Sequence, residues 1–165
     1  MRIGVIKLID DEMKLTHQLC FSAYNVNKLF NKFYEKQLSQ FGLTFSQYLV
    51  LLTLWEENPQ TLLSIGKKLN LASNTLSPLL KRLEQAGWVQ RNRDESDKRN
   101  LIITLTIKGL NEQEAVHEAI AKCVSSQFDV DEYMKAKSIM DNLEETLKTI
   151  TKDDSNETIW CRIFR

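Results

Sequence analysis

Three cysteines carry the most reactive chemistry in this sequence, at Cys20, Cys123 and Cys161. The sequence contains no C-x-x-C pair, and His17 and His117 do not complete a zinc spacing, so we expect no metal, no cofactor and no secreted disulfide framework. A deprotonated thiol is a nucleophile toward peroxides, whereas a cysteine on an amphipathic helix is commonly a small buried apolar residue. Residue type alone leaves both interpretations open.

Charge is unevenly distributed along the chain. Residues 61–108 contain nine Lys or Arg and four Asp or Glu, a net charge of +5, whereas the 22 basic and 22 acidic residues of the whole chain balance. The remainder is therefore negative by the same amount. A basic middle segment between acidic flanks is typical of a polyanion-binding surface, although a solvated face with scattered charges is the alternative.

Periodicity and capping signals predict three short helices and a β-hairpin, of which the last two helices and the hairpin lie within this basic part. Thr44, with Gln47 three residues later, has the pattern of a capping box, and Gly87 is a typical C-terminal stop. The expected helices span residues 44–55, 61–69 and 72 or 73–86, and the expected strands span 88–90 and 101–106 around a charged loop at 91–100. Longer helices are expected at about 11–40, 108–127 and 129 or 131–151.

The third of these short helices could read DNA. A helix-turn-helix places the start of its second helix in the major groove, where short polar side chains meet base edges and phosphates. The residues expected to do so are Ser73, Asn74, Thr75 and Ser77, followed by the basic Lys81 and Arg82. In the alternative interpretation, Ser73 and Asn74 only cap a structural helix. Pro78 implies that the helix starts just before it or tolerates an irregularity.

The charged hairpin strengthens the DNA-binding interpretation. Arginine at a wing tip can enter the narrow, electronegative minor groove, and an adjacent aspartate can hold its guanidinium in place. The wing residues expected to contact DNA are Arg91, Arg93, Asp97, Lys98 and Arg99. A helix pair followed directly by such a hairpin predicts a winged helix-turn-helix.

Two stretches resemble the MarR family of transcription regulators. Asp97-Lys98-Arg99, with Leu105-Thr106 and Lys108-Gly109, is similar to the family's wing signature, and residues 76–84 are similar to its recognition helix. The resemblance covers about residues 14–150. It implies a mainly α fold with a small β-hairpin, in a homodimer with interleaved terminal helices that reads a pseudo-palindromic operator in double-stranded DNA.

The resemblance divides the chain into an N-terminal extension (1–11), a single MarR-type domain (12–152) and a C-terminal tail (153–165). Within the domain, the dimerisation helices are expected at about 12–40 and 109–151, and the winged helix-turn-helix at about 44–108. No apolar run approaches the length of a membrane span, and the first residues make a poor secretory signal. We therefore expect a cytoplasmic protein with no membrane partner.

The segment Gln18-Leu19-Cys20-Phe21, followed by Tyr24, resembles the OhrR-type branch of the family, which senses organic hydroperoxides through a cysteine. This resemblance implies that Cys20 is the redox-sensing thiol and that Tyr24 and Tyr34 support it. A further hydrogen-bonding tyrosine of that branch falls at Phe45, which has no hydroxyl. Hydroxyl donors and a helix N-terminus stabilise a thiolate.

In the two-cysteine members of this branch, a second cysteine closes an intersubunit disulfide. Cys123 lies close to the matching position, so the resemblance implies that it resolves the oxidised Cys20 of the other subunit. The alternative is that a small cellular thiol caps Cys20. Cys161 receives no role.

The expected function is a dimeric transcription repressor, not an enzyme, that leaves its operator when organic hydroperoxide or a related oxidant oxidises Cys20. The alternative is a MarR-type regulator that responds to a small lipophilic or phenolic ligand between the dimerisation helices and the DNA-binding lobes. A thiol peroxidase is disfavoured because no Arg or Thr partner stands next to Cys20 and the basic wing would have no role.

Overall fold

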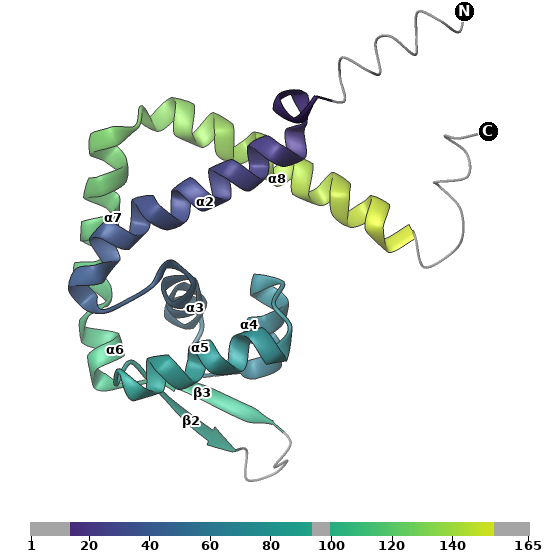
Figure 1. Ribbon diagram of the computed structural model, residues 1–165. Helices are drawn as coiled ribbons and strands as arrows, with labels where there is room; N and C mark the ends of the chain where they lie inside the picture. Colours follow the sequence, from purple (N-terminus) through teal and green to yellow (C-terminus); the bar gives the residue numbers. More distant parts are fainter. Residues whose placement is uncertain (1–13, 94–99, 154–165) are drawn as a thin grey trace, which may run out of the picture. The chain divides into compact units, whose positions relative to one another are not determined.

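The computed structural model describes residues 14–93 and 100–153 (Figure 1). The chain forms two compact units, Met1–Ile120 and Ala121–Arg165. In the first unit the elements are η1 (Leu15–His17), α2 (Leu19–Leu38), η2 (Ser39–Phe41), α3 (Phe45–Glu56), β1 (Gln60–Thr61), α4 (Leu62–Leu69), α5 (Ser73–Gln85), β2 (Val89–Arg93), β3 (Leu101–Leu105) and α6 (Ile107–Asn111). α7 (Gln113–Gln127) crosses from the first unit into the second, which also contains α8 (Val130–Asp153).

The first long helix begins later than the periodicity predicts. Among the described residues, α2 starts at Leu19, and the prediction of a helix from about residue 11 or 12 is wrong for residues 14–18. Residues 15–17 form a separate 3-10 turn, and Gln18 is extended, with φ −84° and ψ 121°. An extended residue interrupts the i to i−4 hydrogen bonds of a helix. Cys20 is therefore the second residue of α2.

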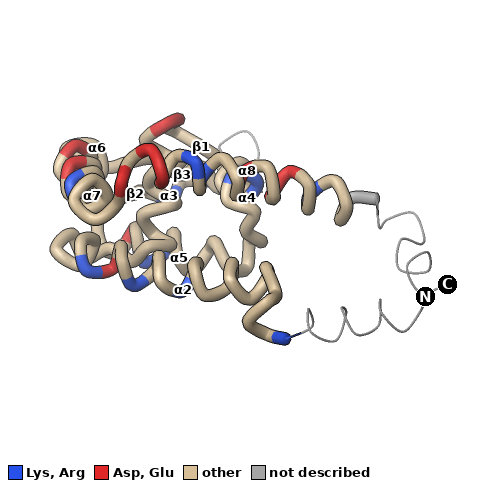
Figure 2. The backbone as a smooth tube through the Cα atoms, turned by 90° about the horizontal axis from the view of Figure 1, so that it is seen from above, with Lys and Arg blue, Asp and Glu red and all other residues tan. Residues whose placement is uncertain are grey.

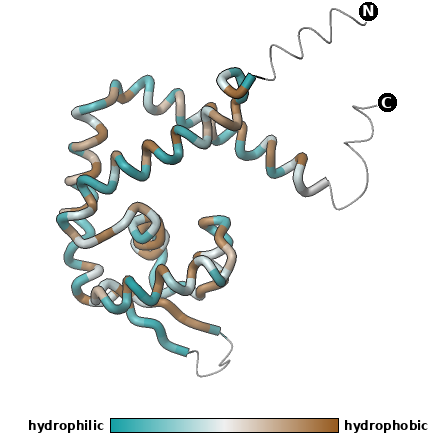
Figure 3. The backbone as a smooth tube through the Cα atoms, viewed as in Figure 1, coloured by the Kyte–Doolittle hydropathy of each residue, from teal (hydrophilic) through white to brown (hydrophobic). Residues whose placement is uncertain are grey.

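The core of the first unit lies where α3, α4 and α5 meet. The fully buried side chains there are Leu51, Leu54, Ile65, Leu76, Leu80 and Leu83. β3 is mostly hydrophobic, whereas β2 is mostly hydrophilic (Figure 3). The predicted inward face of the reading helix α5 is confirmed, except that Leu79 is half-buried.

Local capping follows the sequence signals. The Gln47 N–H donates to the Thr44 hydroxyl at 3.4 Å, and the Thr44 N–H donates to the Gln47 side chain at 2.8 Å, so the predicted capping box is confirmed. Gly87 adopts φ +77° after α5, as expected of a C-terminal stop. α5 begins at Ser73 and continues through Pro78, so the helix tolerates the proline.

The wing belongs to a three-stranded antiparallel sheet in the order β1-β3-β2. β1 has two residues, too few to show a period in the sequence, and was not predicted. β2 extends to Arg93, so the predicted strand at 88–90 is too short. Arg91 and Arg93 pair with Ile103 and Leu101 of β3 and lie in the strand, not in the loop at 91–100.

The helix predicted at 108–127 is divided near Glu112 into α6 and α7. At its start, the Thr106 hydroxyl donates to the Gly87 carbonyl at 2.6 Å and accepts the Gly109 N–H at 3.0 Å. The Lys108 ammonium donates to the Ala86 carbonyl at 2.9 Å and lies 4.9 Å from the centre of the Trp88 ring. These contacts attach α6 to the end of α5 and the start of the wing. We call them the α5–α6 junction.

The second unit contains the end of α7 and the whole of α8. Lysine and carboxylate residues are interspersed along α8 (Figure 2), and Lys148 pairs with Glu144 and Glu145 at 3.0 and 2.9 Å. Its exposed apolar residues are Val130, Met134, Ile139, Met140, Leu147 and Ile150. Within the described ranges, no helix has the length and hydropathy that crossing a membrane requires.

The α5–α6 junction leaves no room for a side chain at Gly109, where an added Cβ would lie 2.3 Å from the Trp88 carbonyl oxygen. We expect Gly109→Ala to lower the free energy of unfolding by about 2–3 kcal/mol, measured by urea denaturation. Gly42→Ala is the control, because Gly42 has φ +68° and open space around it, so only about 1 kcal/mol of backbone strain is expected. Equal losses in the two variants would contradict the close approach.

Candidate thiol site and nucleic-acid interface

The Cys20 thiol is free and exposed in the first turn of α2. The N–H groups of a first helical turn have no intrahelical partner and carry the positive end of the helix dipole. The N-cap residue, Gln18, supplies no side-chain cap to this turn. The thiolate is the form of a cysteine that reacts with peroxides.

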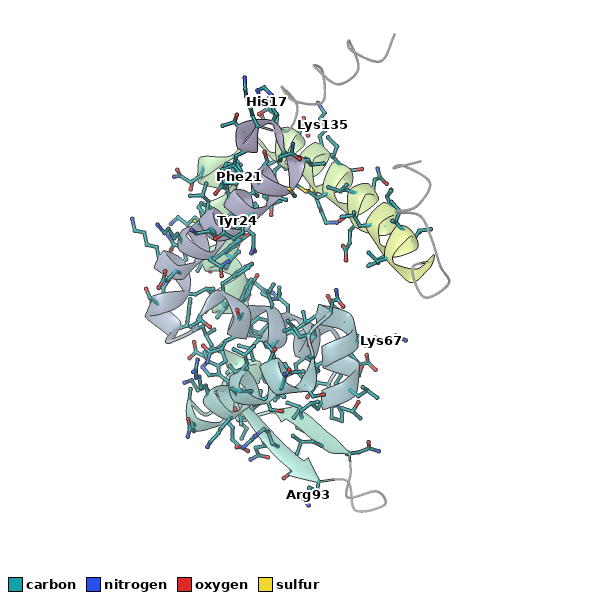
Figure 4. The ribbon with its side chains drawn as sticks, turned by 45° about the vertical axis from the view of Figure 1, so that its right-hand side comes forward. His17, Phe21, Tyr24, Lys67, Arg93 and Lys135 are labelled. Carbon is teal, nitrogen blue, oxygen red and sulfur yellow. The ribbon has the colours of Figure 1, made fainter. Side chains whose placement is uncertain are left out.

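Tyr24, labelled in Figure 4, follows Cys20 by four residues on α2, a spacing that places two residues on one face of a helix. Its side chain is 57% exposed, and the Lys28 ammonium lies 5.2 Å from the centre of its ring. Helical side chains lean toward the N-terminus, so the Tyr24 ring leans along α2 toward Cys20. Support of Cys20 by Tyr24 remains a prediction.

Tyr34 is too far along α2 to reach Cys20 of its own chain. The two residues are fourteen positions apart, which corresponds to about 21 Å along a helix. Tyr34 is buried and stacks on Phe45, with ring centres 4.9 Å apart and an interplanar angle of 13°. The two positions that match hydrogen-bonding tyrosines of the OhrR-type branch are thus adjacent in this chain. Support of Cys20 by Tyr34 requires a second copy and remains a prediction.

Of the other two cysteines, the structure describes Cys123. Cys123 lies on α7 within the second unit, and its thiol is free and half-exposed. Cys161 lies outside the described residues. Among the residues that the structure describes, no three His, Cys, Asp or Glu side chains are grouped so that they could hold a metal ion.

The start of α5 presents the predicted reading residues to solvent. Ser73, Asn74 and Thr75 are exposed, and Ser77 is half-exposed. The N-cap of α5 is Ala72 and no side chain caps the helix, so the alternative in which Ser73 or Asn74 is the cap is wrong. Their polar side chains are therefore available to an outside partner. Further along the helix, Lys81 and Arg82 are also exposed.

Arg91 is engaged within the protein. Its Nε and Nη2 donate to Oε2 of Glu84 at 2.8 and 2.6 Å, and its backbone N–H donates to Oε1 at 3.1 Å. The sequence predicts that an aspartate of the wing pairs with a wing arginine. It does not predict the pair that Arg91 forms with Glu84. No periodic signal marks this pair, because it joins a helix to a strand across a turn. A DNA contact by Arg91 remains a prediction. Arg91 would make this contact while its guanidinium is paired with Glu84.

Arg93 is the exposed basic residue at the end of the described part of β2. It projects away from the helices of the first unit (Figure 4). Asp97, Lys98 and Arg99, predicted as wing contacts, lie outside the described residues. Of the predicted wing residues, Arg93 is therefore the one that the structure places in the open at the end of the strand.

Arg91 lowers the pKa of the Glu84 carboxyl below its ordinary value, chiefly through the side-chain hydrogen bonds. Burial opposes this effect, and the positive charge and the backbone N–H of Arg91 add to the lowering. A carboxyl with a lowered pKa in the folded state stabilises the fold above the unfolded pKa of about 4.3, and this contribution is lost as the pH falls through the lower, folded value.

We therefore expect Glu84→Gln to lower the free energy of unfolding by about 0.5–1 kcal/mol near pH 7, a value limited by the partial solvent exposure of both side chains. The loss should shrink as the pH is lowered below about 4. Urea denaturation of parent and variant over this range measures it. A difference between the two that stays constant with pH would show that the carboxylate charge is not what stabilises the junction of α5 and β2.

Known proteins share both the sequence and the fold. A family profile described as Transcriptional regulator SarA/Rot matches residues 32–120. The organic hydroperoxide resistance transcriptional regulator of Bacillus subtilis is 39% identical over 138 residues, which cover 83% of this chain and 94% of that protein. MarR of Escherichia coli is 23% identical over 76% of this chain and 96% of that chain, with a TM-score of 0.59, and shares the fold.

AbfR, solved from Staphylococcus epidermidis, is more similar. The structure of reduced AbfR bound to DNA is 62% identical over 86% of this chain and 97% of that chain, with a TM-score of 0.79. Overoxidised AbfR bound to DNA gives 62% identity over 86% and 98% of the two chains, with a TM-score of 0.75. Disulfide-formed AbfR gives 60% identity over 88% and 98%, with a TM-score of 0.61.

These matches confirm the predicted resemblance, the mainly helical winged-helix fold and the class of regulator as opposed to enzyme. They do not test the individual site residues, which remain predictions. The chain belongs to the SarA/Rot family of transcriptional regulators, with a MarR-like winged-helix fold.

Proposed function

We propose that this chain is a homodimeric, DNA-binding repressor whose reduced form occupies a pseudo-palindromic operator and whose release is controlled by Cys20. The observation that carries the proposal is the exposed, free Cys20 thiol in the first turn of α2. Its chemistry is thiol oxidation, and the nearby Tyr24 supplies a hydroxyl that can stabilise charge on the sulfur. The organic hydroperoxide regulator of Bacillus subtilis supports a peroxide as the inducer.

DNA binding is assigned to α5 and the wing. The exposed polar residues at the start of α5 suit base edges in the major groove, and Lys81 and Arg82 suit phosphates. Arg93 and the predicted tip residues suit the adjacent minor groove. The reduced, DNA-bound form of AbfR supports the same role for this chain.

Dimerisation is assigned to the long helices. On α2, Leu19, Val26 and Leu29 are exposed in the single chain, and α8 exposes a series of apolar residues of its own. Apolar faces of this size are typical of surfaces that another protein covers. A second copy of the chain, which would also bring Tyr34 of one subunit toward Cys20 of the other, is the occupant we propose.

The first chemical step is oxidation of the Cys20 thiolate. The sulfur attacks the terminal oxygen of an organic hydroperoxide, an S–O bond forms, and the O–O bond breaks. The leaving alkoxide takes a proton and departs as the alcohol, and Cys20 becomes a sulfenic acid. The peroxide is reduced by two electrons, and the sulfur is oxidised by two.

The second step is resolution by a thiol. Cys123 of the second subunit attacks the sulfenic sulfur, a disulfide forms and water leaves. AbfR is known in a disulfide form, and its overoxidised form has been solved bound to DNA. We therefore propose that the disulfide, more than oxidation of the sulfur as such, separates this chain from its operator. A small cellular thiol would act in the same way if Cys123 does not reach Cys20.

A DNA titration tests the proposal. Reduced protein is titrated by fluorescence anisotropy, at stated salt, against a labelled duplex from the region upstream of its own gene, and cumene hydroperoxide is then added. We expect release that a reductant reverses, with an apparent Kd weakened by at least about 100-fold, because a smaller difference would move too little of the population.

Cysteine variants identify the thiols. Cys20→Ser should bind DNA and stay bound in peroxide, and Cys123→Ser should release DNA much less completely. Cys161→Ser is the matched control and should behave as the parent does. Peroxide-driven release from Cys20→Ser would refute the thiol switch and favour a regulator that responds to a lipophilic ligand. Absence of DNA binding by the reduced parent would refute the regulator itself.

A second prediction concerns the buried tyrosine. Tyr34→Phe preserves the stacking on Phe45 and removes only a hydroxyl. If that hydroxyl stabilises the Cys20 thiolate across the dimer, oxidation should be about tenfold slower, because a hydrogen bond to a charged group is lost. The rate is measured by trapping the sulfenic acid in a Cys123→Ser, Cys161→Ser background. Tyr48→Phe, in the same aromatic cluster, is the control, and equal rates in both variants would contradict the role of Tyr34.

A further inference from the structure

The Glu84 carboxylate joins the reading helix to the wing. Glu84 lies in the last turn of α5 and Arg91 lies in the middle of β2. Both carboxylate oxygens are used: one receives the Arg91 backbone N–H, and the other receives two donors of the guanidinium. We call this set of three hydrogen bonds the Glu84–Arg91 clamp.

The clamp acts on a strand that has little other support. In the sheet order β1-β3-β2, β2 is an edge strand that pairs only with β3 among the described strands. The Arg91 backbone N–H would otherwise be a free donor at that edge, and Glu84 satisfies it. An isolated pair of strands is only marginally stable, so the direction of the wing depends on contacts at its base.

That direction matters for reading two grooves together. A winged helix places its recognition helix in the major groove and its wing in the neighbouring minor groove. The angle between α5 and β2 therefore decides whether both contacts form on one duplex. Arg93 follows Arg91 by two residues on the same strand, so a displacement of Arg91 is carried directly to the end of the wing.

Charge alone and positioning of the wing predict opposite effects on DNA affinity when the Glu84 carboxylate is removed. Glu84 is one of four acids in the segment 61–108, which carries a net charge of +5. Removing an acid from such a surface would tighten binding to any DNA through charge alone. If the clamp positions the wing, removing the same acid weakens binding to the operator. The sign of the effect separates the two views.

We propose that Glu84 is a positioning residue for DNA recognition, which holds Arg91 and thereby the wing at the angle that lets α5 and the wing read adjacent grooves. The proposal rests on the DNA-binding function proposed above. Glu84 itself contacts no base in this scheme, and Arg91 serves the wing by being held at its base.

Two single variants and a charge-matched control test it. Glu84→Gln keeps the shape and removes the charge, whereas Arg91→Lys keeps the charge and removes the fork. Glu114→Gln removes an exposed acid from α7 and controls for net charge. Affinity is measured for a duplex carrying the footprinted upstream site and for an unrelated duplex. For both clamp variants, the ratio of the two affinities should fall about tenfold relative to the control, while binding to the unrelated duplex stays equal or tightens.

Footprinting supplies a readout that general loss of stability would not give. In Glu84→Gln, hydroxyl-radical protection of the minor groove beside each half-site should be lost, while protection of guanine N7 from methylation in the major groove remains. The exchange of both residues, Glu84→Arg with Arg91→Glu, should restore part of the minor-groove protection. Loss of both kinds of protection together would overturn the proposal, because it would indicate a merely structural role.

Two other outcomes would also refute the positioning role of Glu84. If Glu84→Gln binds the operator as tightly as the control, or more tightly, with both footprints intact, the clamp does not position the wing, although DNA binding stands. If the reduced parent protects no site on its upstream DNA, the proposed function fails first and the positioning role fails with it.

Discussion

The arrangement of the DNA-binding parts depends on the α5–α6 junction. The Thr106 hydroxyl donates to the Gly87 carbonyl just after α5, and the Lys108 ammonium donates to the carbonyl of Ala86, the C-cap of α5, and lies over the Trp88 ring. Gly109 approaches the Trp88 carbonyl more closely than any residue with a side chain could. The Glu84–Arg91 clamp lies on the other side of the turn. Hydrogen bonds at the junction and at the clamp therefore hold α5, the wing and α6 together. α6 is therefore bonded directly to the end of α5 and the start of the wing.

Sequence reasoning was strongest where a local rule has a single structural solution. The Thr44–Gln47 capping box, the stop at Gly87 and the buried Leu76, Leu80 and Leu83 of α5 follow from hydrogen bonding and periodicity within a few residues, and the structure contains them. The Thr106 to Gly109 part of the wing signature was recognised by resemblance. Its physical role, in attaching α6 to α5, became clear only from the contacts.

The structural features that the sequence did not predict share a different cause. Each depends on residues far apart in the chain or on elements too short to show a period. The extended Gln18 moves the start of α2 to Leu19, although nothing in the apolar pattern marks it. β1 is two residues long, and Arg91 finds its partner on another element. The late start of α2 places Cys20 in the first turn of the helix and not in its interior.

We propose that disulfide formation at Cys20 removes this regulator from DNA. The most direct measurement follows two quantities in one sample during stepwise addition of organic hydroperoxide: the DNA-bound fraction, and the fraction of Cys20 peptide linked to the Cys123 peptide by mass spectrometry under non-reducing conditions. The proposed switch predicts that the bound fraction falls in proportion as the linked peptide appears. Complete release while Cys20 remains an unlinked thiol would contradict it.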